Sequence, residues 1–145
     1  MTTRSSGFTL VELMVVVAII GILSATGIVT YNGYISGAKQ KSTVNAMLQI
    51  SLAQTEYYSN SGEYYMQGDT CDPTEENSNL IEEYLFGDGD VISKETGYEM
   101  CIQSDPGGTP YLVKAEDLKA AVELSDGTKE RKIITMTANG VWTRK

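Results

Sequence analysis

A long apolar segment dominates the first part of the chain. From Phe8 to Val29, 22 residues include a single charged residue, Glu12. A helix of this length and composition is long enough to cross a bilayer. The segment is longer than the apolar core of a secretory signal peptide and lacks the small-residue cleavage site that follows such a core. We therefore expect it to be retained as a membrane anchor.

Beyond the apolar segment, the pattern becomes that of an amphipathic helix. The cluster Ser59-Asn60-Ser61-Gly62 competes for backbone hydrogen bonds and ends in glycine, the residue favoured just after a helix. We predict one helix of close to 50 residues, ending near Tyr58. The residues expected on its apolar face are Tyr31, Tyr34, Ala38, Met47, Leu48, Leu52 and Thr55.

The remaining sequence predicts a loop followed by strands. Residues 63–96 are acidic and irregular, with one possible short helix at 77–86. Asp126-Gly127 and Asn139-Gly140 are strong hairpin turn signals. The candidate strands are Tyr98–Gln103, Tyr111–Lys114, Ala120–Leu124, Lys132–Thr137 and Val141–Arg144.

These elements predict an α+β fold in two layers. A long N-terminal helix, with one transmembrane half and one amphipathic half, packs on a small antiparallel sheet of three to five strands. The helix covers one face of the sheet, and the two together form a small head.

The charge of the chain excludes one class of partner. The formal net charge is −8 and the pI is near 4.5. A protein that neutralises phosphates concentrates Lys and Arg on one face, so we expect no direct nucleic-acid partner. The charge is also uneven: 56–105 holds thirteen acidic residues and one Lys, whereas 106–145 holds five acidic and seven basic residues. We interpret the basic end, including Arg131, Lys132, Arg144 and Lys145, as a surface that pairs with acidic loops of neighbouring heads.

The sequence contains no candidate catalytic machinery. It has no histidine, which removes the commonest general base and transition-metal ligand. Gly107-Gly108 lacks the lysine and helix context of a nucleotide site, and no nucleophile elbow is present. We therefore expect neither enzyme activity nor a cofactor.

An acidic loop raises the question of calcium. Asp69, Asp72, Asp88 and Asp90 are the kind of oxygen ligands that calcium prefers. Their spacing does not fit an EF-hand, and a charge-rich loop is usually solvated. We name no metal ligands.

Two cysteines, Cys71 and Cys101, lie outside the apolar segment. An even pair in this part of the chain suggests one disulfide and an oxidising compartment. The alternative is two buried thiols that act as small apolar residues. A second local feature is the tyrosine group Tyr57, Tyr58, Tyr64 and Tyr65, which we interpret as an anchor of the following loop rather than an adhesive or electron-conducting path.

Glu12 is the informative residue of the apolar segment. A carboxylate deep in a membrane helix costs roughly 2.5–3.5 kcal/mol on insertion scales and needs a partner or a function. No Lys or Arg in the same segment supplies that partner. The alternative is that Glu12 lies at headgroup depth in the first helical turn, where the helix dipole favours a negative charge.

The sequence Gly7-Phe8-Thr9-Leu10-Val11-Glu12, with the apolar run after it, resembles the cleavage and methylation signature of type IV prepilins and type II secretion pseudopilins. The resemblance implies that prepilin peptidase removes Met1–Gly7 and that Phe8 becomes N-methylated. It also implies that Glu12 pairs with the N-terminal amine of a neighbouring subunit. In one departure, many pilins have a helix-breaking proline where this chain has Val29, which leaves Gly21 and Gly27 as candidate weak points.

The resemblance also implies an organisation and a location. The leader is 1–7, the transmembrane and filament-core helix is 8–30, and the pilin-like head is 31–145. The chain spans the cytoplasmic membrane once before assembly and lies in a cell-surface pilus afterwards. Its implied partners are other copies in a helical filament, prepilin peptidase, the pilus assembly machinery and, before assembly, membrane lipid.

The expected function is that of a structural subunit of a type IV pilus. The alternative within the same family is a pseudopilin of a type II secretion or competence pseudopilus; the head cysteines and the lack of an evident calcium loop favour the pilin. An alternative from another class is an anchored binding domain that never polymerises, in which Glu12 is incidental. Filaments of this kind serve adhesion, twitching motility, DNA uptake or secretion.

Overall fold

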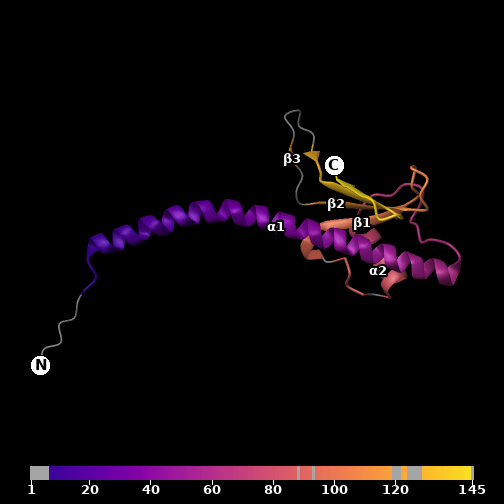
Figure 1. Ribbon diagram of the computed structural model, residues 1–145, viewed down its shortest axis with the longest axis horizontal. Helices are drawn as coiled ribbons and strands as arrows, with labels where there is room; N and C mark the ends of the chain where they lie inside the picture. The colour runs from indigo at the N-terminus through magenta and orange to yellow at the C-terminus, as the bar shows by residue number, and fades with distance from the viewer. Residues whose placement is uncertain (1–6, 88, 93, 119–121, 124–128, 145) are drawn as a thin grey trace, which may run out of the picture. The chain divides into compact units, whose positions relative to one another are not determined.

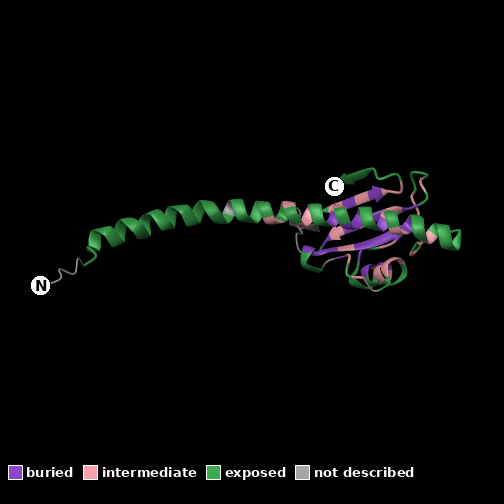
Figure 2. Ribbon diagram, turned by 60° about the horizontal axis from the view of Figure 1, so that its bottom comes forward, coloured by how far each residue is buried: buried purple, intermediate pink, exposed green. Residues whose placement is uncertain are grey.

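The computed structural model describes all residues except 1–6, 88, 93, 119–121, 124–128 and 145 (Figure 1). The chain forms two compact units, Met1–Ala38 and Lys39–Lys145. Helix α1, Leu10–Ser61, contributes to both units. In the first unit its residues from 10 to 28 are exposed, whereas in the second unit one of its faces is buried (Figure 2).

The second unit has the predicted α+β architecture. Its four-stranded antiparallel sheet has the order β1-β2-β5-β6, with bounds Tyr98–Gln103, Leu112–Asp117, Ile133–Thr137 and Trp142–Arg144. A second, two-stranded sheet is formed by β3, Val122–Glu123, and β4, Lys129–Glu130. Helix α2, Glu75–Phe86, and the 3-10 helix η1, Lys94–Thr96, precede β1. The fold class predicted from sequence is therefore confirmed.

The strands agree with the sequence pattern to different degrees. Strand β1 has the predicted bounds, and β2, β5 and β6 overlap their predicted ranges. The Asn139-Gly140 signal does join two paired strands, since β5 and β6 pair through Met136 and Trp142 and Gly140 has a φ of 76°. The Asp126-Gly127 turn lies outside the described residues, as does most of the predicted strand Ala120–Leu124. Strand β4 was not predicted.

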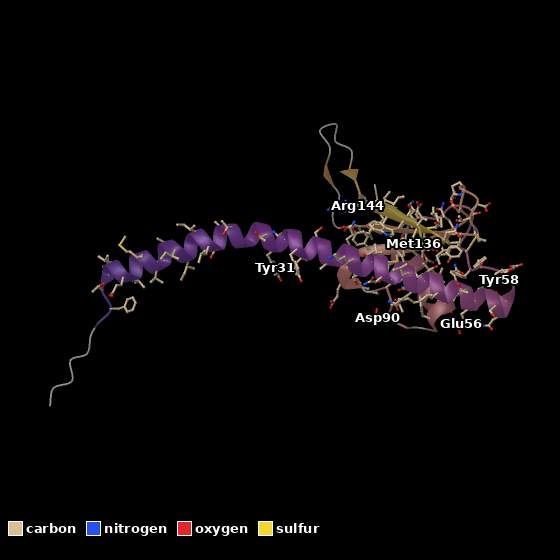
Figure 3. The ribbon with its side chains drawn as sticks, viewed as in Figure 1. Tyr31, Glu56, Tyr58, Asp90, Met136 and Arg144 are labelled. Atoms are coloured by element: carbon tan, nitrogen blue, oxygen red, sulfur yellow. A yellow bond between two sulfur atoms is a disulfide. The ribbon has the colours of Figure 1, made fainter. Side chains whose placement is uncertain are left out.

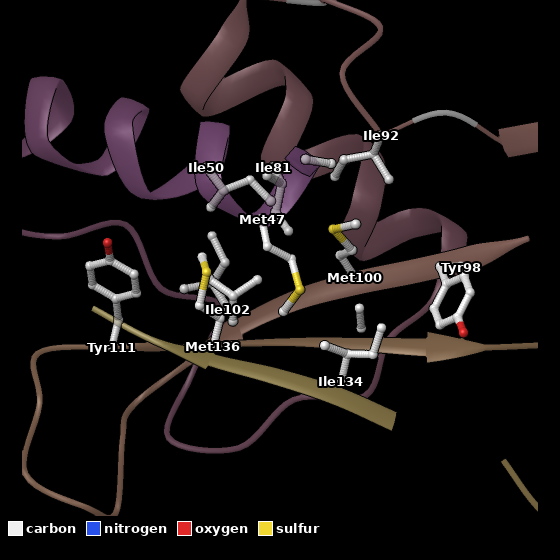
Figure 4. Packing of buried hydrophobic residues seen from close by; sticks show 13 residues of the cluster. Met47, Ile50, Ile81, Ile92, Tyr98, Met100, Ile102, Tyr111, Ile134 and Met136 are labelled. Carbon is white, nitrogen blue, oxygen red and sulfur yellow. The ribbon is translucent and has the colours of Figure 1, made fainter. Parts of the chain in front are cut away.

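The core lies between the sheet and one face of α1 (Figure 4). Met47 and Ile50 of α1 are fully buried, as is Ile81 of α2. On the sheet, alternate residues of β2 and β5 are buried, as the period of two requires. The buried sheet residues include Met100, Ile102, Val113, Ala115, Ile134 and Met136.

The apolar face of α1 differs from the predicted one. Of the seven residues expected on that face, Met47 is buried, but Leu48 and Leu52 are 43% and 73% exposed. Tyr31, Tyr34, Ala38 and Thr55 are exposed as well, so most of this prediction was wrong. Two polar residues, Thr43 and Gln54, take core positions instead, because their hydrogen-bonding groups find partners. Thr43 Oγ1 donates to the Lys39 carbonyl oxygen over 2.9 Å.

Gln54 joins α1 to the chain that follows it. Its Nε2 donates to the Tyr65 carbonyl oxygen over 2.7 Å, and its Oε1 accepts from the Tyr65 amide over 2.9 Å. The helix ends at Ser61, where Gly62 adopts a φ of 81° and its amide donates to the Tyr58 carbonyl. Gln54 thus satisfies both backbone groups of a residue that has just turned away from the helix.

Tyrosine rings hold the same turn, as the sequence predicted. Tyr58 stacks on Tyr64 with ring centroids 4.5 Å apart, and Tyr57 meets Tyr65 edge to face at 6.0 Å. Tyr64 also contacts Tyr111, whose hydroxyl donates to Ser51 of α1. Burial raises the pKa of Tyr111, which keeps this hydroxyl protonated as a donor.

A disulfide between Cys71 and Cys101 ties the loop before α2 to strand β1, which selects one of the two alternatives left by the sequence. The Cα atoms are 6.1 Å apart and the residues are 30 positions apart. Next to it, Thr74 caps α2 by accepting from the Asn77 amide. Ser78 of α2 accepts from the Met100 amide of β1, so helix and strand are held together by polar as well as covalent contacts.

We predict that Cys71→Ser with Cys101→Ser lowers the free energy of unfolding by about 3–4 kcal/mol, because the disulfide restricts the unfolded chain. The measurement is urea unfolding of the full chain in detergent, followed by Trp142 fluorescence. Wild-type protein treated with a reductant should unfold at the same urea concentration as the double variant. Equal stability of variant and oxidised wild type would contradict the prediction.

We predict that Gln54→Ala lowers the free energy of unfolding by about 2–3 kcal/mol, because both backbone groups of Tyr65 lose their buried partner. Gln49→Ala is the matched control: Gln49 lies exposed on the same helix, and its loss should change stability by less than about 0.5 kcal/mol. The two variants are compared by the same urea assay. Similar losses in both would show that helix propensity, and not the Tyr65 contacts, sets the effect.

Candidate processing and assembly site

Thr9 and Glu12 form a reciprocal cap at the start of α1. The Glu12 Oε2 atom accepts from the Thr9 amide over 2.9 Å and from the Thr9 hydroxyl over 2.6 Å. In return, the Glu12 amide donates to Thr9 Oγ1 over 3.2 Å. This is the capping-box arrangement, in which a Thr and a Glu three residues later satisfy each other's free amides. It gives the carboxylate partners within its own chain.

The Gly7–Phe8 bond lies just outside this cap. Both residues precede the helix, have no regular secondary structure and are exposed, Phe8 by 76%. A Cβ atom added at Gly7 would meet nothing within 4 Å. The fold itself therefore makes no demand for glycine at this position.

The helix after the cap presents apolar side chains on all sides. Residues 10–28 are all exposed. Among the described residues, α1 is the helix long and apolar enough to cross a membrane. An apolar surface of this size is far larger than the patches that monomeric soluble proteins expose, and it marks a surface that contacts lipid or other protein.

The sequence-predicted site residues fall into two places. Gly7, Phe8 and Glu12 lie together at the start of α1 in the first unit, and the cysteine pair lies in the second unit. Sequence reasoning missed Thr9, which provides every hydrogen bond to Glu12 described above. The Thr-x-x-Glu spacing before an apolar run was a sufficient signal for it.

The charged residues of the second unit form scattered contacts. Arg131 pairs with Glu116 over 2.9 Å, and Arg144 donates to Gln40 over 3.0 Å. Lys94 pairs with Glu75 over 2.7 Å and lowers the pKa of that carboxyl. In the part of the chain that the structure describes, no group of three or more acidic, His or Cys residues is placed to hold a metal ion. Asp88, one of the four acidic residues considered for calcium, and Lys145 lie outside that part.

Comparison with known proteins finds a known motif over this N-terminal site. Residues 2–28 match the family described as the prokaryotic N-terminal methylation motif. The chain is 42% identical over 64 residues to a fimbrial protein of Neisseria meningitidis serogroup B, covering 44% of this chain and 38% of that protein. It is 41% identical over 64 residues to the type IV major pilin protein PilE1 of Neisseria gonorrhoeae, covering 44% and 39%.

A longer match joins the chain to a probable minor fimbrial protein of Dichelobacter nodosus, with 32% identity over 95 residues, 65% of this chain and 60% of that protein. The chain spans about two fifths of the length of the two Neisseria proteins. No solved structure matches the chain. The relatives are structural pilin and fimbrial proteins and not enzymes. The N-terminal part of the chain thus carries the methylation motif and is similar in sequence to the N-terminal part of type IV pilins and fimbrial proteins.

Proposed function

We propose that this chain is a structural subunit of a type IV pilus. Prepilin peptidase cleaves it between Gly7 and Phe8 and methylates Phe8, and the pilus assembly machinery then adds it to a filament of identical subunits. Three parts follow: the leader 1–7, a membrane and filament-core helix 8–30, and a head 31–145. Before assembly the chain spans the cytoplasmic membrane, and afterwards it lies on the cell surface.

The observation that carries this proposal is the exposed apolar surface of α1 between residues 10 and 28. Lipid can cover it in the precursor, and neighbouring helices can cover it in a filament. Exchange between these two environments needs little free energy, because both are apolar. The similarity to proteins named as a fimbrial protein and a major pilin supports contact with neighbouring helices in a filament.

Glu12 provides the contact that specifies how subunits are added. Both Thr9 bonds use its Oε2 atom, which leaves Oε1 for a donor from another molecule. We propose that this donor is the methylated amine of Phe8 in a neighbouring subunit. Opposite charges attract strongly where water is excluded, and each pair forms only when one subunit is displaced along the axis from the next. Thr9 and Glu12 both follow the cleaved bond, so the cap survives processing.

The direct test is the intact mass of the protein from filaments sheared off the cell surface, compared with protein left in membranes. We expect the filament-borne species to lack Met1–Gly7, to carry one methyl group and to be two hydrogens lighter because of the disulfide. Protein that stays in membranes at full length would favour an anchored binding domain. Protein that is processed but never sheared off would favour a pseudopilin.

We predict that Glu12→Gln reduces the yield of sheared filaments at least tenfold while cleavage after Gly7 continues. The amide retains an acceptor for Thr9 but loses the charge that attracts an amine, a difference of a few kcal/mol where water is excluded. Glu56→Gln is the matched control, since Glu56 is an exposed residue of the same helix in the second unit (Figure 3). Wild-type filament yield from Glu12→Gln would remove Glu12 from the assembly contact.

A further inference from the structure

Two tyrosines follow the apolar segment of α1. Tyr31 is 64% exposed and Tyr34 is 73% exposed, and the side chain of Tyr31 projects from the helix in Figure 3. They are three positions apart, so they lie one turn apart on neighbouring parts of the helix surface. Within the described residues, no hydrogen bond to either phenol hydroxyl is present. Each ring is thus an apolar body with an unpaired polar tip.

The residues around these rings already satisfy their own polar groups. Thr30 Oγ1 donates to the Thr26 carbonyl and Thr26 Oγ1 donates to the Leu23 carbonyl, so both hydroxyls are used within the helix. Gly27 has open space where a Cβ would lie. The result is an open depression lined by Thr26, Gly27, Thr30, Tyr31 and Tyr34. Nothing polar competes there for the phenol groups.

The spacing between these tyrosines and Glu12 matches one bilayer. Tyr31 lies 19 positions after Glu12 in the same helix, which at 1.5 Å per residue is about 29 Å. The hydrocarbon core of a bilayer is about 30 Å thick. Aromatic rings with polar tips are enriched at the level of the lipid headgroups. If the rings lie at one boundary of the core, Glu12 lies at the other.

We propose that Tyr31 and Tyr34 anchor the precursor in the headgroup layer of the membrane and thereby hold the Thr9–Glu12 cap in the opposite headgroup layer. This inference rests on the proposed membrane-anchored precursor, and it adds the depth at which the helix lies in the bilayer. Glu12 then avoids the cost of a charge in the hydrocarbon, which is greatest at its centre. Of the two interpretations of Glu12, headgroup depth describes the stored precursor, and pairing with an amine describes the assembled filament.

Lipid is the partner that fits this surface best. Residues 10–28 are all exposed and, apart from Glu12, Ser24 and Thr26, none has a polar side chain, as in a segment that contacts lipid on every side. A headgroup layer supplies both an apolar boundary for the rings and hydrogen-bonding partners for the phenol hydroxyls. Lys39 and Lys41 follow in the sequence and add positive charges suited to lipid phosphates.

The test uses tryptophan as a depth reporter in the full-length precursor, placed in vesicles of phosphatidylcholine brominated at shallow or deep acyl positions. Trp142 is first replaced by phenylalanine to remove the natural tryptophan. Single reporters are then introduced as Leu10→Trp, Ile19→Trp, Tyr31→Trp and Tyr58→Trp. Ile19 lies midway along the segment, and Tyr58, in the second unit, serves as the aqueous reference.

We expect the Leu10→Trp and Tyr31→Trp reporters to be quenched roughly twofold more by shallow than by deep bromine, as interfacial residues should be. The Ile19→Trp reporter should show the opposite order, and the Tyr58→Trp reporter should be unaffected. Two outcomes would overturn this inference but leave the membrane anchor in place. One is stronger quenching of the Leu10→Trp or Tyr31→Trp reporter by deep than by shallow bromine. The other is absence of quenching for Tyr31→Trp while Ile19→Trp is quenched. Absence of quenching for Ile19→Trp would overturn the membrane anchor itself, and with it this inference.

Discussion

The apolar surface of α1 that its own chain leaves uncovered is the constraint on which the rest of this structure depends. Burying one large aliphatic side chain is worth about 1.5–3 kcal/mol, and the first unit exposes many of them. The total far exceeds the 5–15 kcal/mol or so by which a domain is stable. Such a helix cannot remain in water. It requires lipid or protein around it.

The polar chemistry of the chain is arranged to suit that requirement. At the start of α1, Thr9 and Glu12 satisfy each other, so the carboxylate has hydrogen-bond partners within its own chain. In the second unit, Gln54 and the disulfide add polar and covalent links to a small apolar core. Small domains bury a smaller fraction of their surface and commonly need such additional links.

The sequence predicted features that depend on strong local patterns. The apolar run, the glycine after α1 and the Asn139-Gly140 turn are signals of this kind, and the helix end, the bounds of β1 and the β5–β6 pairing agree with them. The buried face of α1 was less predictable, because Thr43 and Gln54 look like surface residues until their partners are known. Their partners include a backbone group 11 positions away, a contact that periodicity cannot show. The two-residue strand β4 is too short to leave a pattern.

The pairing of β3 with β4 bears on what sets the register of the main sheet. The two strands pair with each other and belong to a sheet separate from the four-stranded one. At the base of this excursion from the main sheet, the Asp117 amide donates to the Lys132 carbonyl over 3.0 Å. This bond extends the pairing of β2 with β5, which already runs from Leu112–Thr137 to Glu116–Ile133. The register of the main sheet is therefore fixed by its own hydrogen bonds and does not depend on the β3–β4 pair.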